Sequence, residues 1–148
     1  MAPRFISRAE LFALRGEERV ARWSGSPAGE PDLAAIDAAI LSAEAEASSY
    51  LLGRYGNSLP TDPTGTPQVL KDKLADIVGY KLQAKWDQVS QAVRDSYTDA
   101  TRWLQAVARG AADLGLAGAP AVDVSTPAVL ATKVAADAGL TLSTLEDW

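Results

Sequence analysis

Residues 33–55 read LAAIDAAILSAEAEASSYLLGRY, and the spacing of their apolar side chains predicts one long amphipathic helix. Apolar residues recur at steps of three and four, which places them on one face of a helix with 3.6 residues per turn. At 1.5 Å per residue the helix would be about 35 Å long. Asp32 is a suitable N-cap, and Gly56 and Asn57 end the pattern. The apolar face consists of Leu33, Ile36, Ile40, Ala43, Ala47, Tyr50 or Leu51, and Arg54/Tyr55.

The opposite face of this helix is polar, and we expect it to meet solvent. It carries Asp37, Ser42, Glu44, Glu46 and Ser49.

Shorter signals precede the long helix. Ser7 and Glu10 have the spacing of a capping box, in which two side chains satisfy amides of the first helical turn. A short helix is therefore expected from about Arg8 to Arg15, with Gly16 as its stop. Residues 17–23 could add one or two turns, and the Gly and Pro content of the next eight residues indicates a loop.

Two further helices are expected after residue 65. Thr66-Pro67 reads as an N-cap followed by proline at the first helical position, and the stripe behind it runs to about Trp86. A second stripe, with steps of four and three, begins at Val93 and ends at Gly110. The stripe of the first helix consists of Leu70, Leu74, Ile77, Val78 and Lys81/Leu82. The stripe of the second helix consists of Val93, Tyr97, Ala100, Leu104 and Val107. The fold class is thus all-α: a small helical bundle of three main helices plus a short N-terminal helix, with an extended C-terminal arm.

The chain divides near Gly110 into a bundle body, residues 1–110, and a C-terminal arm, residues 111–148. The body carries 13 Lys/Arg and 14 Asp/Glu, whereas the arm carries one Lys and five acids. Thr126-Pro127 and Gly139 are compatible with a short helix over 127–138, and the remainder of the arm is expected to be partly extended.

The arm is apolar as well as acidic. Exposing a large apolar side chain loses about 1.5–3 kcal/mol relative to burying it, so we expect these groups to be covered. Two interpretations stay open: the arm folds back over a groove on its own body, or it crosses to a partner or a neighbouring subunit. The candidate contact residues are Leu140, Leu142, Leu145 and Trp148.

Composition excludes several functions. The 148 residues include no histidine and no cysteine, which removes disulfides, thiol nucleophiles, Cys/His zinc sites and Ser/His/Asp triads. A net charge of -5 argues against a duplex-DNA binder. No apolar run reaches the length of a signal peptide or a membrane span, so we expect a protein made in a cytoplasm that has no membrane partner.

No catalytic, metal or cofactor residue emerges from the carboxylates. Glu44 and Glu46 are two residues apart and diverge around the helix, so they cannot form an acid/base pair. Asp72 and Asp76 share a face but alternate with lysines, which favours solvated surface. We therefore predict a protein without enzymatic activity; an enzyme would need acids from different helices to converge.

The tryptophans of the body are expected to be structural. Trp103 lies beside an apolar stripe, so packing within the bundle or between subunits is favoured over stacking on a nucleic acid. Trp23 and Trp86, each near the end of an expected helix, are interpreted as core-edge residues.

Several motifs in a fixed order resemble a known family. They are Glu44 to Tyr55, then Leu59-Pro60 and Pro67, then Leu74 to Ile77 with Tyr80, and then Tyr97 to Leu104 through Gly110. Over about residues 5–110 the chain resembles the small head-completion, or head-tail connector, proteins of Mu-like tailed phages. The segment with Leu140, Leu142, Leu145 and Trp148 is similar to the apolar C-terminal segment that such proteins carry.

The resemblance implies a structural adaptor, repeated about twelve times in a ring beneath the portal of a phage head. Its partners would be the portal protein, docked through the C-terminal arm, neighbouring copies, and a tail-side connector or terminator protein. Double-stranded DNA would pass through without specific binding. Localisation would be the head-tail interface of the virion, after synthesis in the bacterial host cytoplasm. An alternative is a small regulatory or adaptor module that binds a single protein partner through its apolar tail.

Overall fold

The computed structural model describes residues 2–25 and 29–116, and every regular element in them is helical. The elements are α1 (Arg8–Arg15), α2 (Glu17–Trp23), α3 (Leu33–Tyr55), the 3-10 turns η1 (Gly56–Ser58) and η2 (Pro63–Gly65), α4 (Gln68–Ala84) and α5 (Gln91–Ala108). The all-α class predicted from the sequence is therefore confirmed, and α3 has the bounds that its apolar periodicity predicts.

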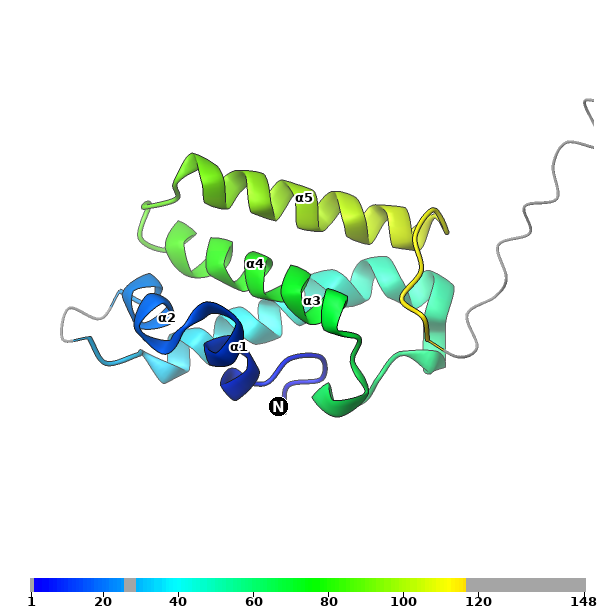
Figure 1. The fold of residues 1–148 in the computed structure, drawn as a ribbon, viewed down its shortest axis with the longest axis horizontal. Coiled ribbons are helices and arrows are strands. Elements are labelled where there is room, and N and C mark those ends of the chain that lie inside the picture. The colour runs from blue at the N-terminus through cyan, green and yellow to red at the C-terminus, as the bar shows by residue number, and fades with distance from the viewer. Residues whose placement is uncertain (1, 26–28, 117–148) are drawn as a thin grey trace, which may run out of the picture.

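Three long helices form the bundle, because α3, α4 and α5 each contact the other two. Figure 1 shows α5 alongside α4 with α3 beneath them, while α1 and α2 cover one side of the α3–α4 pair. The short helices α1 and α2 both touch α4. The body is thus a three-helix bundle with an N-terminal helical cover.

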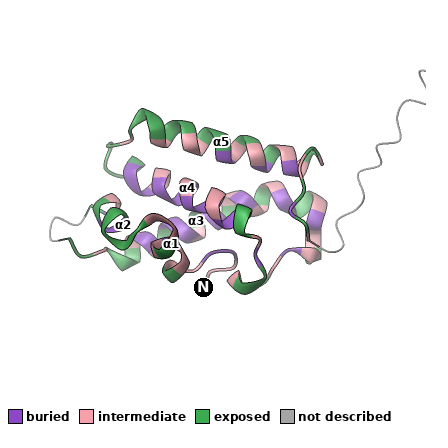
Figure 2. Ribbon diagram, viewed as in Figure 1, coloured by how far each residue is buried: buried purple, intermediate pink, exposed green. Residues whose placement is uncertain are grey.

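The core lies where the stripes predict it. Leu51, Leu74 and Leu104, one from each long helix, are fully buried. Figure 2 shows buried positions along the inner faces of the helices and exposed positions along the outer face of α5. Leu33 is an exception, since it is the first residue of α3 and is 44% exposed. The expectation that Leu33 belongs to the buried face was wrong.

Both ends of α4 differ from expectation. Pro67 is the N-cap of the helix and not its first helical residue, because its ψ of 140° is extended. The helix ends at Ala84, two residues before the expected Trp86. There the amide of Trp86 donates to the carbonyl of Gln83, and Asp87 turns the chain with a φ of 53°.

The two tryptophans near helix ends are placed differently. Trp23 packs against the core, as expected of a core-edge residue, with its ring over Gly79 of α4. Trp86 is 46% exposed and lies against Gly25, where an added Cβ would approach the indole to 2.3 Å. The core-edge interpretation was therefore wrong for Trp86, whose ring covers backbone of the loop after α2.

Glu44 was expected on the solvent face of α3 and is instead buried, with 5% of its surface exposed. Its carboxylate accepts hydrogen bonds from the backbone N–H groups of Arg4, Phe5 and Ile6, at 2.7–3.1 Å. These bonds allow the side chains of Phe5 and Ile6 to enter the core fully. The correction has a clear physical reason: an extended N-terminal segment covers this face of α3 and its amides need an acceptor.

The expected solvated surface at Asp76 also needs correction. The capping box of α1 is present as predicted, and Lys71 pairs with Glu10 of that box. Arg15 pairs with Asp76 at 2.6 Å, with both side chains about three-quarters buried. The acids on α4 and α1 thus contribute to holding the helical cover on the bundle.

Candidate functional site at the base of the arm

The candidate contact residues Leu140, Leu142, Leu145 and Trp148, like the predicted helix 127–138, lie outside the described residues. The structure does describe the chain as far as Leu116. It therefore shows where the predicted arm starts and what holds that starting point.

The turn after α5 is a Schellman motif. Gly110 has a φ of 80°, and its N–H donates to the carbonyl of Val107 at 3.1 Å. The N–H of Ala111 donates to the carbonyl of Ala106 at 2.8 Å. These are the two bonds that close a helix C-terminus with a left-handed residue. The stop predicted at Gly110 is confirmed, and the turn directs the chain back toward α3.

Arg54, from the last turn of α3, holds this returning segment. One guanidinium nitrogen, Nη1, donates to the carbonyls of Val107 at 2.8 Å and Ala112 at 2.6 Å. The other, Nη2, approaches the carboxylate of Asp113 at 3.4 Å. Only 8% of the Arg54 side chain is exposed. A buried cation therefore joins the end of α5 to the segment that follows it.

Tyr55 adds a second attachment next to the first. Its hydroxyl donates to the carboxylate of Asp113 at 3.0 Å and accepts from the N–H of Leu114, also at 3.0 Å. Asp113 further accepts from the N–H of Gly115 at 2.8 Å. We call Arg54, Tyr55 and Asp113, with the backbone that they bind, the clasp.

The electrostatics of the clasp favour a neutral phenol beside a charged carboxylate. Burial raises the pKa of Tyr55, with the neighbouring Asp113 carboxylate acting in the same direction. The hydrogen bond from the Gly115 amide, followed by that from Tyr55, lowers the pKa of Asp113. Around neutral pH each group is therefore in the state that the hydrogen bonds require.

Apolar contacts complete the attachment. Leu114 is buried and belongs to the core, and Leu116 packs against it in part. Figure 1 shows the segment after α5 running beside the C-terminal end of α3. The first six residues assigned to the arm, 111–116, thus lie against the body.

A second polar cluster joins the three long helices. Tyr97 of α5 donates its hydroxyl to Glu46 of α3 at 2.7 Å, and Lys81 of α4 pairs with the same carboxylate at 2.8 Å. The rings of Tyr80 and Tyr97 stack at 4.1 Å. Glu46, expected in solvent, is therefore a partly buried link, which corrects the assignment made from helix periodicity.

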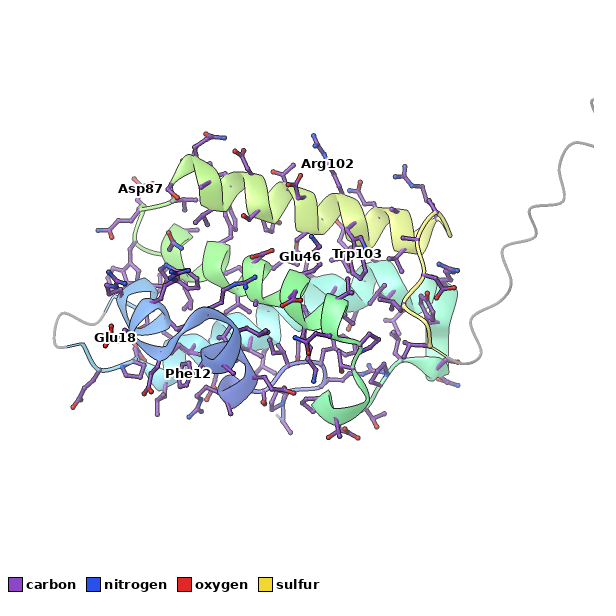
Figure 3. The ribbon with its side chains drawn as sticks, viewed as in Figure 1. Phe12, Glu18, Glu46, Asp87, Arg102 and Trp103 are labelled. Atoms are coloured by element: carbon purple, nitrogen blue, oxygen red, sulfur yellow. The ribbon has the colours of Figure 1, made fainter. Side chains whose placement is uncertain are left out.

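Trp103, labelled with Glu46 in Figure 3, packs partly buried against the core. The favoured expectation was packing within the bundle or between subunits, and the structure shows the packing within the bundle. Within the described residues no group of three or more Asp or Glu side chains could hold a metal ion. In the same residues, no helix combines the length and the hydropathy that a membrane crossing would need.

Sequence reasoning missed the clasp. It placed Arg54/Tyr55 on the apolar face of α3 without assigning them a partner, and it did not single out Asp113. A usable signal was present, because a charged residue and a tyrosine at the end of an apolar stripe require polar partners when buried. Nothing in the local sequence shows that those partners lie more than fifty residues away.

The described residues define a class: an all-helical bundle in which the segment that follows its last helix is clasped to the end of α3. The comparison with family models then gives the family. The model described as Bacteriophage Mu, Gp36 matches residues 5–131, which is most of the chain. The chain belongs to this family and is therefore a protein of Mu-like phages. A search of curated proteins found no match.

Family membership confirms the coarser part of the resemblance, a Mu-like phage protein of the structural or morphogenetic kind. The residues that carried the resemblance are also those that join the long helices. Arg54, Tyr55, Tyr80 and Tyr97 all make the contacts described above.

Proposed function

We propose that this protein is a structural head-tail connector of the virion, without enzymatic activity and without a cofactor. Copies of the chain would form a ring beneath the portal, and the resemblance implies that the ring contains twelve copies. The ring docks on the portal protein through the C-terminal arm, and Leu140, Leu142, Leu145 and Trp148 contact the portal or a neighbouring copy. On its other side the ring offers a platform to a tail-side connector or terminator protein.

The observation that carries this proposal is the combination of family membership with the clasp. An adaptor that docks through an arm must transmit force and position from the arm to its body. The buried Arg54 and the core residue Leu114 attach the start of the arm to the body and support this role. A tail that only needed to bind one partner loosely would gain nothing from such an attachment.

The charges of the body fit a channel through which double-stranded DNA passes without specific binding. Phosphates bind clustered cations that have no other partner. Many cations of the described residues are already paired with carboxylates, and the whole chain has a net charge of -5. The pairs are Arg8–Asp37, Arg15–Asp76, Arg54–Asp113, Lys71–Glu10, Lys81–Glu46 and Arg102–Asp99.

Removal of residues 140–148 tests the arm directly. We expect far-UV circular dichroism to show an unchanged helical bundle, because the described core lies within residues 5–114. We expect cosedimentation with portal particles to be abolished. Leu52→Ser is a matched control, since Leu52 is an apolar side chain of the body that is 51% exposed. This control should still cosediment.

A truncated protein that binds portals as well as the intact chain would contradict docking through the arm. Binding of the intact chain to a single non-virion protein, with no association with portals, would favour the alternative of a small regulatory or adaptor module. Both results are separable from misfolding, because helicity is measured on the same samples.

A further inference from the structure

A groove lies at the end of the bundle opposite to the clasp. It consists of two adjoining hollows of about 360 Å³ and 330 Å³, which share Arg19, Trp23 and Gln83. α2 forms one wall, and α4 with the beginning of α5 forms the other. In Figure 1 this end holds α2 and the turn between α4 and α5, whereas the chain leaves the described body at the far end of α5.

The groove combines aromatic walls with a small-residue floor. Trp23 and Trp86 both line it. Gly79 lies on its floor, where an added Cβ would come within 3.1 Å of the Trp23 ring. Trp86 is 46% exposed although its indole is large and apolar. Exposed aromatic surface around a hollow is suited to receiving an apolar side chain.

The groove is also positively charged. Arg19 and Arg22 line it and form no ion pair with any described residue. The one acid in its described lining, Asp76, is already paired with Arg15. A ligand with two carboxylates next to apolar side chains would therefore find both kinds of partner here.

The side-chain amide of Gln83 in the groove needs a hydrogen-bond acceptor. Its side chain lines both hollows, and its amide nitrogen is buried without an acceptor in the described part of the chain. A buried donor without a partner is unfavourable. A small rotation of this amide toward a bound carbonyl or carboxylate oxygen would supply the missing acceptor.

Residues 142–148 of this chain, LSTLEDW, have the complementary chemistry. Glu146 and Asp147 supply two adjacent carboxylates, and Leu145 and Trp148 supply apolar groups on either side of them. No basic residue follows Lys133, so nothing in the segment opposes the arginines of the groove. We propose that the groove binds residues 142–148 of a second copy of the chain.

We assign the segment to a second copy because the proposed ring needs a contact between copies, and the exit of the chain and the groove lie where they can supply one. The chain leaves the described body beside the clasp, at one end of the bundle, and the groove lies at the other end (Figure 1). Because the segment leaves one end of a copy and the groove lies at the other end, each copy can contact the next one head to tail. Head-to-tail contacts of this type can close into a ring. The 25 residues from 117 to 141 can extend to about 80 Å, enough to reach a neighbour. This inference rests on the proposed ring, and of the two contacts proposed above for Leu142, Leu145 and Trp148 it takes the one with a neighbouring copy.

Single-cysteine variants test the contact cleanly, because the chain has no cysteine of its own. Gln88→Cys places a thiol at the groove, and Ser143→Cys places one within the bound segment. We expect a mixture of the two full-length variants to form a disulfide-linked dimer containing one of each. A disulfide that forms only within a chain carrying both substitutions, and never in the mixture, would overturn the proposal.

Charge reversal identifies the groove. We expect Arg19→Glu with Arg22→Glu to reduce the crosslinking rate of the mixture more than about tenfold at physiological salt. Adding Glu146→Arg with Asp147→Arg should restore it. Arg102→Glu in α5 with Arg109→Glu at its C-cap, both exposed and absent from the lining of the groove, is the control and should have no effect. Equal effects of both reversals, or no restoration, would overturn the assignment.

The outcome also separates this inference from the proposed function. Rings that form on portals while groove and segment reversals change nothing would refute the groove contact and leave the connector intact. Failure of every variant and of the unmodified chain to form rings would refute the connector itself. Circular dichroism of each variant excludes unfolding as the cause.

Discussion

Replacing Arg54 by methionine removes the charged part of the clasp and keeps an unbranched side chain of similar length. The guanidinium donates to two backbone carbonyls, at 2.8 and 2.6 Å, from a side chain that is 8% exposed. Hydrogen bonds of charged groups contribute about 1.5–3 kcal/mol each, and deleting one partner leaves the other without a bond. Because the two bonds share one donor group, their contributions are not additive. We expect the free energy of unfolding to fall by about 2–4 kcal/mol.

The fall in the free energy of unfolding cannot exceed the free energy with which the clasp attaches the segment after α5. If the segment after α5 detaches while the bundle stays folded, the variant loses the free energy of attachment and no more. Hydrogen exchange of the amides of Leu114 and Gly115, which bond to Tyr55 and Asp113, reports this detachment. We expect both amides to exchange at least tenfold faster in the variant.

Urea unfolding followed by circular dichroism gives the stability, with Arg109→Met as the matched control at an exposed position. The control should stay within about 0.5 kcal/mol of the unmodified chain. An Arg54→Met protein with unchanged stability and unchanged exchange at Leu114 would refute the role assigned to the clasp.

Three further predictions concern the body. Leu104→Asp should unfold it, giving a random-coil circular dichroism spectrum, because it places a carboxylate at a fully buried position of α5. Glu44→Ala should lower the free energy of unfolding by about 2–4 kcal/mol in a urea titration, since three amides lose their acceptor; a loss below about 0.5 kcal/mol would contradict this. Burial and the hydrogen bond to Glu46 raise the pKa of Tyr97 to about 12, so its contribution is complete below pH 10 and is lost as the pH rises to 12. Stability measured across that range should fall more for the unmodified chain than for Tyr97→Phe.

Periodicity predicted the elements that depend on apolar burial. The stripe through Leu104 and Val107 predicted the inner face of α5, and the glycine at 110 predicted its end. The capping box at Ser7 and Glu10 was also predictable, because both of its partners lie within four residues of each other. Signals of this kind depend only on residues that are close together in the chain, so they can be recognised in a single sequence.

The polar contacts that determine the site are not local. Periodicity shows that Glu44 lies off the apolar face of α3, but not that an extended segment forty residues earlier supplies amides to it. Likewise Asp113 follows a helix end with no motif around it, and only the fold brings it to Arg54. A buried carboxylate with distant backbone partners, such as Glu44, is therefore assigned to solvent by sequence reasoning.

The central claim is that copies of this chain assemble on a portal through the arm. Electron microscopy of the full chain mixed with portal particles of its own phage tests it most directly. The account predicts a closed ring of copies coaxial with the portal, with density from each copy reaching it. Folded, monomeric protein that leaves the portals bare at high concentration would contradict the account.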